Sequence, residues 1–242
     1  MNEEELRKEL AKRQIPLPET AFSVYRRLTA LLQDWNRRFN LTAIDEPEEV
    51  YEKHILDCLL PLQHVSLYGT VCDVGSGAGF PGLVWAAARP ECAFTLIEPT
   101  AKRCSYLEEC VRTCELANVE IINARAEDQA LISRESFDIV TARAVANLTV
   151  LSELCVPLVR VGGLFLALKG AKGEEELGEA QFALKTLGCD KPELITMELP
   201  SGARTLILAR KIHKTPSSYP RSYAKIKHKP LIGKGSHGAI NL

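Results

Sequence analysis

The chain has 242 residues, of which 46% are hydrophobic and 25% charged, and its formal net charge at pH 7 is −1. This length fits one large domain, or one domain with a small appendage, and the composition supplies enough apolar residues for a sizeable core. No run approaches the ~18 apolar residues that span a bilayer, and the start Asn2-Glu3-Glu4-Glu5 does not resemble a signal peptide. We therefore expect a cytoplasmic protein with no membrane partner.

The charge is distributed unevenly along the chain. From residue 199 onward the sequence holds nine basic residues and no Asp or Glu, whereas residues 1–198 carry 21 Lys and Arg against 31 Asp and Glu. A basic C-terminal segment is typical of a tail that binds a polyanion, and a solvated, disordered tail is the alternative. The eight cysteines form no Cys-x-x-Cys motif, so we expect reduced, packed thiols and no metal site.

Three helices are predicted before the first strand, at about 3–14, 19–38 and 47–62. The second helix is amphipathic, because its apolar residues recur at three- and four-residue steps. It also carries four arginines that could contact phosphate or form an ordinary solvated face: Arg26, Arg27, Arg37 and Arg38. In the third helix His54 and Asp57 could act as a general-base pair; we favour a structural hydrogen bond near a helix junction.

After Gly69 the pattern changes to alternating strands and helices, which predicts an α/β fold with a doubly wound, mostly parallel sheet. The strands are predicted at 70–74, 93–97, 119–123, 137–141, 164–168, 193–199 and 204–211. The helices between them are predicted at 81–89, 100–117, 148–160 and 173–187. We therefore divide the chain into an N-terminal helical extension (1–66), an α/β domain (67–211) and an irregular basic tail (212–242).

One stretch, residues 71–82, organises the rest of the chain. It is expected to run from a short strand through a glycine-rich turn into a helix whose first amides are free to donate. Its glycines fall at 75, 77 and 79, and Phe80 stands where the dinucleotide fingerprint Gly-x-Gly-x-x-Gly needs its third glycine. The pattern acid-x-Gly-x-Gly-x-Gly resembles instead the first motif of the Rossmann-like S-adenosylmethionine (SAM) methyltransferases.

Polar residues follow the predicted strands at the edge where an open parallel sheet binds its ligands. Gly75 and Gly77 would let the methionine part of SAM approach the backbone, and Glu98 lies where an acid accepts ribose hydroxyls in nucleoside-binding folds. Ala126 and Glu127, after the third strand, are placed for the adenine side. A cluster of acids suits a cationic sulfonium better than a pyrophosphate, so the sequence predicts SAM as the cofactor.

Further motifs occur along the chain, namely Asn40-Leu41-Thr42, His54-Ile55-Leu56-Asp57, Phe80-Pro81-Gly82, Ala142-Arg143-Ala144 and Leu168-Lys169-Gly170. Together with the glycine loop they resemble the bacterial ribosomal RNA small subunit methyltransferase G family, also called glucose-inhibited division protein B. The resemblance implies SAM-dependent methylation of guanine N7 at one position of 16S rRNA. It also implies cofactor contacts at Gly75, Phe80, Ala126, Glu127 and Arg143. Cys58 in place of the common serine, and Glu98 in place of the more usual aspartate, depart from the family pattern.

Guanine N7 attacks with a free lone pair and loses no proton, so positioning can supply much of the rate without a strong general base. We predict catalytic roles for Arg143 and Lys169, which would orient the base or contact phosphate, and a structural role for both is the alternative. The expected partner is 16S rRNA or the 30S subunit, bound by a monomeric enzyme. The basic tail, with Tyr219 and Tyr223, would add RNA contacts. A SAM enzyme with a small-molecule acceptor and a non-enzymatic RNA-binding protein are the alternatives.

Overall fold

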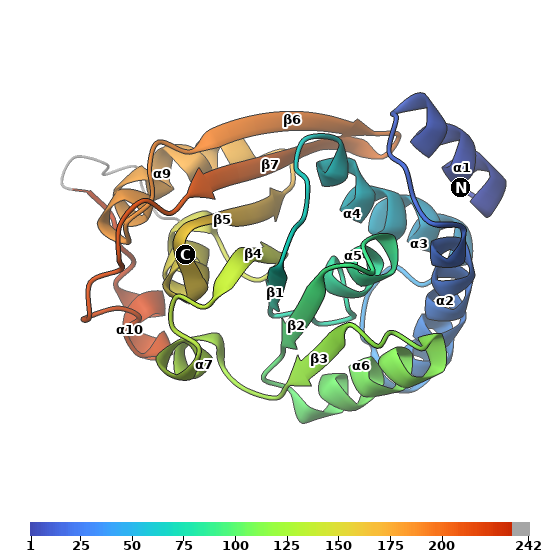
Figure 1. Ribbon diagram of the computed structural model, residues 1–242, viewed down its shortest axis with the longest axis horizontal. Helices are drawn as coiled ribbons and strands as arrows, with labels where there is room; N and C mark the ends of the chain where they lie inside the picture. The colour runs from blue at the N-terminus through green and yellow to red at the C-terminus, as the bar shows by residue number, and fades with distance from the viewer. Residues whose placement is uncertain (234–242) are drawn as a thin grey trace.

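A computed structural model, which describes residues 1–233, contains a seven-stranded sheet with helices on both faces (Figure 1). The strand order is β3-β2-β1-β4-β5-β7-β6; β7 is antiparallel to both of its neighbours, and the other pairs are parallel. The strands are β1 (Thr70–Val74), β2 (Ala93–Ile97), β3 (Val119–Ile122), β4 (Phe137–Arg143), β5 (Val159–Lys169), β6 (Glu193–Leu199) and β7 (Gly202–Arg210). The predicted α/β class is confirmed. The order reverses between β1 and β4, and ligands bind at the carboxyl ends of strands beside such a point.

Alternating strand residues divide the core into two layers. Val71 and Ile139 belong to one cluster of buried residues, and their chain neighbours Cys72 and Val140 belong to the other. The first layer contains α5 (Gly82–Ala88) and α6 (Ala101–Cys114), and the second contains α7 (Ala126–Ile132), α8 (Leu148–Cys155) and α9 (Gly173–Thr186). Because strand side chains alternate in direction, each face of the sheet is covered by its own helices.

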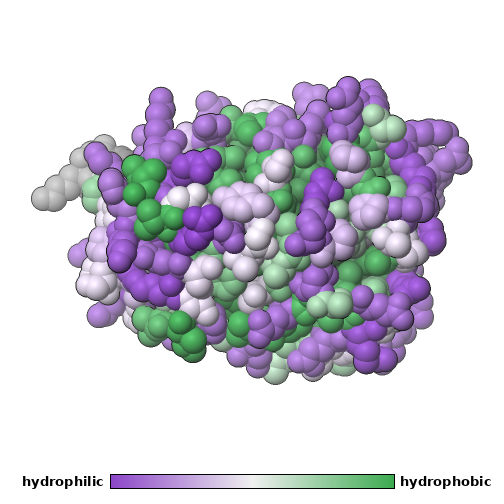
Figure 2. All heavy atoms as spheres, in the orientation of Figure 1, coloured by the Kyte–Doolittle hydropathy of each residue, from purple (hydrophilic) through white to green (hydrophobic). Residues whose placement is uncertain are grey.

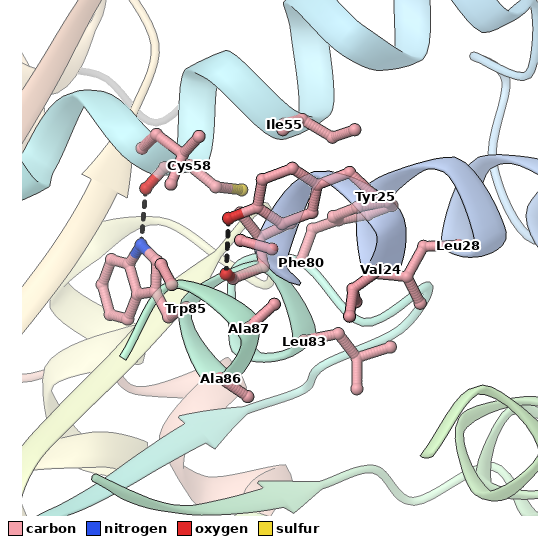
Figure 3. Packing of buried hydrophobic residues seen from close by; sticks show 14 of the residues in the cluster. Val24, Tyr25, Leu28, Ile55, Cys58, Phe80, Leu83, Trp85, Ala86 and Ala87 are labelled. Carbon is pink, nitrogen blue, oxygen red and sulfur yellow. Dashed lines mark hydrogen bonds between the residues drawn. The ribbon is translucent and has the colours of Figure 1, made fainter. Parts of the chain in front are cut away.

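The N-terminal extension packs directly on the first layer. It consists of α1 (Glu3–Lys12), α2 (Glu19–Phe39) and a continuous helical segment of α3 (Pro47–Val50), the π-helical turn η1 (Tyr51–Leu56), α4 (Asp57–Leu59) and the 3₁₀ turn η2 (Leu60–Gln63). Figure 3 shows α5 between α2 and α4. Tyr25 Oη donates to Val84 O at 3.1 Å, and Trp85 Nε1 donates to Cys58 O. Tyr25 and Trp85 are fully buried, so these bonds tie the extension to the helix that follows the glycine loop.

The sequence pattern misplaces the end of α8 and the start of β5, and it misses helix α7. The predicted helix at 148–160 is wrong at its end, because α8 stops at Cys155, a 3₁₀ turn follows and β5 begins at Val159. Pro157 has no amide hydrogen with which to continue the helix. Helix α7 has only seven residues, too few for an apolar period to be recognised.

The sequence predicts that the basic tail is irregular throughout, and this prediction is wrong. Helix α10 (Tyr223–His228) lies in it, and Ile226 in that helix is completely buried. Arg134 donates to the backbone carbonyls of Thr215, Pro216 and Tyr219. The tail therefore packs along the α/β domain; residues 234–242 of the predicted tail lie outside the described residues.

Figure 2 shows apolar side chains at the lower left of the view, over the region that α7 occupies in Figure 1. Leu131 and Ile132 at the end of α7 are 71% and 80% exposed.

No helix within residues 1–233 is long and apolar enough to cross a membrane. Among the same residues, no group of three or more His, Cys, Asp or Glu is arranged to hold a metal ion.

A buried ion pair anchors the tail. Glu153 is 1% exposed and accepts hydrogen bonds from Nε and Nη2 of Arg221 at 2.8 and 2.6 Å. The variant Arg221→Ala leaves this carboxylate without its charge partner, so we expect the free energy of unfolding to fall by about 3–5 kcal/mol. Urea denaturation measures the change. Adding Glu153→Gln should recover most of the loss, and an unchanged midpoint in the single variant would contradict the anchoring role.

Candidate functional site

Three glycines shape the loop that joins β1 to α5. Gly75, Gly77 and Gly79 have φ of +70°, +57° and +88°, conformations that other residues rarely adopt. Val145, from the loop after β4, lies against Gly75: a Cβ added to this glycine would be 2.7 Å from Cγ2 of Val145. The glycine loop is therefore bordered directly by the chain that follows β4.

Acids at the strand ends hold the amides of the glycine loop. Gly77 N donates to Glu98 Oε2 at 3.0 Å, and Gly82 N donates to Asp73 Oδ2 at 2.9 Å. The expectation that the first amides of α5 are free to donate is therefore wrong for Gly82. Glu98, which is 2% exposed, also accepts from Thr100 N at 2.9 Å, so its carboxylate fixes the loop against the end of β2. Its contact with ribose hydroxyls stays a prediction.

Asp73 is a buried acid with an unused oxygen. Within residues 1–233, its Oδ1 and the Oγ1 of Thr141, which stands opposite on β4, are buried without a hydrogen-bond partner. Burial raises the pKa of Asp73 to about 7, and the hydrogen bond from Gly82 N offsets this only in part. Above that pKa, the negative charge of Asp73 under the glycine loop disfavours a phosphate there and favours a cationic ligand.

Asp57 joins the N-terminal extension to two strands of the sheet. Its Oδ2 accepts from Arg143 Nη1 at 2.9 Å, and its Oδ1 accepts from Arg204 Nε at 3.0 Å. Arg143 ends β4 and Arg204 lies in β7, so one carboxylate fixes guanidinium groups from two strands. Sequence reasoning missed Arg204, because a basic residue in a late strand belongs to no recognisable motif.

His54 contacts Arg143 and not Asp57. Its Nδ1 lies 2.9 Å from Arg143 Nη2, and its Nε2 lies 3.3 Å from Thr42 Oγ1. Burial, together with the Arg143 charge, lowers the pKa of His54 to about 3, so the neutral ring accepts at Nδ1 and donates from Nε2. Phe80 stacks on this ring at 4.4 Å between centroids. The predicted hydrogen bond between His54 and Asp57 is thus wrong, and a ring with both nitrogens engaged is unsuited to general-base catalysis.

His54, Asp57, Arg143 and Arg204 line a cavity of about 600 Å³ between the extension and the carboxyl ends of β4 and β5. The cavity brings together Arg143 and Lys169, the two predicted catalytic residues, with Asp57. The Lys169 side chain is 8% exposed, and its Nζ lies 2.7 Å from Glu176 Oε2. Sequence reasoning missed Glu176 as well, because it is one of three consecutive acids at the start of α9.

The remaining predicted cofactor residues lie on the other side of the glycine loop. Ala126 and Glu127 begin α7, shortly after β3; Ala126 is buried and Glu127 half-buried. Neither lines the cavity, whereas Val145 both lines it and lies against Gly75. The predicted site therefore has two parts, one at the ends of β1 to β3 and one at the ends of β4 and β5, with Val145 between them.

The strand order, the glycine loop and the acids around it define a Rossmann-like α/β protein of the methyltransferase type. A SAM-dependent methyltransferase from Aquifex aeolicus, solved by crystallography, shares the fold with a TM-score of 0.55 at 18% identity, over 72% of this chain and 97% of that chain. A family model described as rRNA small subunit methyltransferase G matches residues 22–204. Proteins named ribosomal RNA small subunit methyltransferase G from Staphylococcus epidermidis and Lactobacillus acidophilus are each 41% identical over 96% of this chain, and the alignments cover 99% and 100% of their lengths. The chain belongs to the ribosomal RNA small subunit methyltransferase G family, as the motifs predicted.

The raised pKa of Asp73 predicts a specific pH dependence of stability. Between about pH 4 and pH 7 the folded protein binds a proton at Asp73 that the unfolded chain has released, so the free energy of unfolding falls as the pH rises. Asp73→Asn removes this dependence. We expect the stability of the wild type relative to the variant to fall by up to about 4 kcal/mol across this range.

Urea denaturation of both proteins at several pH values measures the difference. The opposite contribution of His54, whose folded pKa is lowered, is the same in both proteins and cancels. Parallel stability profiles for the two proteins would show that Asp73 is ionised in the fold throughout.

Proposed function

We propose that this protein transfers the methyl group of SAM to N7 of one guanine in 16S rRNA. The observation that carries the proposal is an acid-flanked glycine loop beside an open cavity, in a chain of the rRNA small subunit methyltransferase G family. The name of the relatives gives the rRNA substrate, and the family resemblance gives N7 as the acceptor atom. Family membership favours this reaction over a small-molecule acceptor and over RNA binding without catalysis.

The cofactor is assigned to the part of the site at the ends of β1 to β3. The residues assigned there are Gly75, Gly77, Phe80, Glu98, Ala126 and Glu127. Arg143, which ends β4 and lines the cavity, is also assigned a contact with the cofactor. The charge of the site supports a SAM ligand, because Asp73 and Glu98 lie against the glycine loop and Asp73 Oδ1 is unpaired within residues 1–233. A positively charged sulfonium is attracted there, whereas two phosphates would be repelled.

Methyl transfer to N7 requires the protein mainly to position the reactants. When SAM is bound it supplies a methyl carbon, which the N7 lone pair takes as the carbon–sulfur bond breaks and sulfur keeps the bonding electrons. N7 loses no proton, in agreement with the engaged ring nitrogens of His54. Arg143 and Lys169 would orient the guanine or its phosphate, and well-oriented reactants gain about 7–11 kcal/mol. Asp57 and His54 set the direction of the Arg143 side chain.

Helix α10 is a stronger candidate for further RNA contacts than the arginines of α2. Lys225, Lys227 and Lys229 are exposed while Ile226 anchors the helix. The guanidinium of Arg125, the residue before Ala126, lies 5.3 Å from the centre of the Tyr223 ring, so α10 adjoins the end of β3. Cations at this position would contact phosphates next to the cofactor.

The arginines of α2, for which the sequence left both phosphate contact and a solvated face open, are partly engaged within the protein. Arg26 pairs with Glu3 and Arg38 pairs with Asp34, while Arg27 donates to a backbone carbonyl. These pairs neutralise part of the arginine face. In this proposal residues 1–66 complete the site, residues 67–211 bind the cofactor and residues 212–242 contact RNA. The enzyme would act as a cytoplasmic monomer on 16S rRNA or the 30S subunit, in keeping with the ribosomal substrate in the family name.

A methyl-transfer assay tests the function directly. With labelled SAM, we expect label in 30S subunits or naked 16S rRNA and none in a panel of small molecules. Mass spectrometry of the digested RNA should show one N7-methylguanine. Isothermal titration should detect SAM binding by the free protein. Absence of label from both RNA substrates, with SAM binding intact, would sink the rRNA assignment and leave the small-molecule alternative.

The lysines of α10 can be tested against matched lysines elsewhere. Changing Lys225, Lys227 and Lys229 together to Glu should weaken RNA binding by about tenfold or more. The slope of log K against log salt concentration should become shallower by an amount that corresponds to about two lost phosphate contacts. The control changes to Glu three exposed lysines that belong neither to the tail nor to the cavity lining: Lys8, Lys12 and Lys191. SAM affinity should not change in either variant. Equal losses of RNA affinity in the two triple variants would refute a specific role for α10.

A further inference from the structure

The cavity of about 600 Å³ lies on the opposite side of Val145 from the cofactor part of the site. Its walls come from four places in the chain: the extension, the loop after β4, the end of β5 with the start of α9, and the β6–β7 hairpin. A ligand in this cavity would therefore be separated from the glycine loop by one side chain. That is the position in which an acceptor can face a methyl donor.

Arg204 and Glu176 are two of the cavity residues that have unused hydrogen-bonding atoms. Arg204 donates from Nε to Asp57 and from Nη1 to nearby carbonyls, while its Nη2 has no partner in the part of the chain that the structure describes. Glu176 accepts through Oε2 from Leu148 N, and the same oxygen contacts Lys169 Nζ. Its Oε1 has no partner within residues 1–233 and is not buried away from solvent. Arg204 thus offers a free guanidinium donor to the cavity, and Glu176 offers a free carboxylate oxygen.

Resting on the proposed function, we infer that this cavity receives the target guanine, flipped out of the RNA, and that Glu176 and Arg204 select guanine there. Guanine presents an acceptor at O6 and donors at N1 and the 2-amino group, whereas adenine presents a donor at its 6-amino group and an acceptor at N1. Glu176 Oε1 accepts from the 2-amino group, and Arg204 Nη2 donates to O6. Neither contact uses N7, which remains free to take the methyl group.

Two glycines allow a substitution that fills the cavity and a matched substitution elsewhere that serves as its control. An added Cβ at Gly170, which lines the cavity, or at Gly178, which lines a separate groove beside α9, meets no atom within 4 Å. We expect Gly170→Trp to lower kcat/KM for methyl transfer to 16S rRNA by about 100-fold, because the base is displaced, while SAM affinity stays within about twofold. Gly178→Trp should leave both values near those of the wild type. Near-normal transfer by Gly170→Trp would overturn the assignment of the cavity.

A substrate with inosine at the methylated position tests the recognition by Glu176. Inosine lacks only the 2-amino group, so the wild type should methylate it about 10- to 100-fold more slowly than guanine. Glu176→Ala should lose this difference between the two bases, and Glu176→Gln, which keeps an acceptor oxygen, should restore part of it. A purely structural role would lower both rates equally and keep the ratio, which would overturn the proposal. Failure of the wild type to methylate the guanine substrate would instead reject the proposed function itself.

Discussion

The carboxylate of Asp57 is the constraint on which the site depends. Its side chain is 10% exposed and pairs at the same time with Arg143 from β4 and Arg204 from β7. Two guanidinium groups that share one carboxylate would repel each other and be costly to bury without the negative charge between them. Because Asp57 belongs to the N-terminal extension, the extension completes the charge balance of the sheet edge. The consequence reaches the glycine loop, since Arg143 holds His54 and the ring of His54 stacks on Phe80.

Charge separates the two parts of the site. Around the glycine loop Asp73 and Glu98 are buried acids, and Asp73 lacks a full set of partners within the described residues. In the neighbouring cavity Arg143 and Arg204 share the carboxylate of Asp57, and Lys169 pairs with Glu176, so the three cations outnumber their two acids. A cationic cofactor and an electron-rich base with its phosphates would thus meet opposite environments on the two sides of Val145.

The tail combines anchoring and exposure in one short segment. Arg221 satisfies the buried Glu153, and Ile226 fills the second layer of the core. Lys225, between these anchors, and Lys227 and Lys229, after them, are exposed to solvent. A cationic surface held by buried groups loses less conformational entropy on meeting RNA than a free tail would.

The sequence by itself determined the fold class, the positions of most strands and the family. Strand ranges such as 70–74 and 93–97 follow from short apolar runs between turn residues, and the glycine loop has an unmistakable local pattern. Helices α7 and α10 escaped prediction because they are short and are stabilised by contacts with distant residues. Only the tertiary structure could pair Asp57 with Arg143 and Arg204, which are 86 and 147 residues away in the chain. Only the tertiary structure shows that His54 bonds to Arg143 and that the amide of Gly82 bonds to Asp73. It also shows that one carboxylate oxygen each of Asp73 and Glu176 has no partner in the described chain. Local patterns record which residues a strand or loop needs, whereas charge pairing across the sheet edge depends on which strand ends the topology brings together.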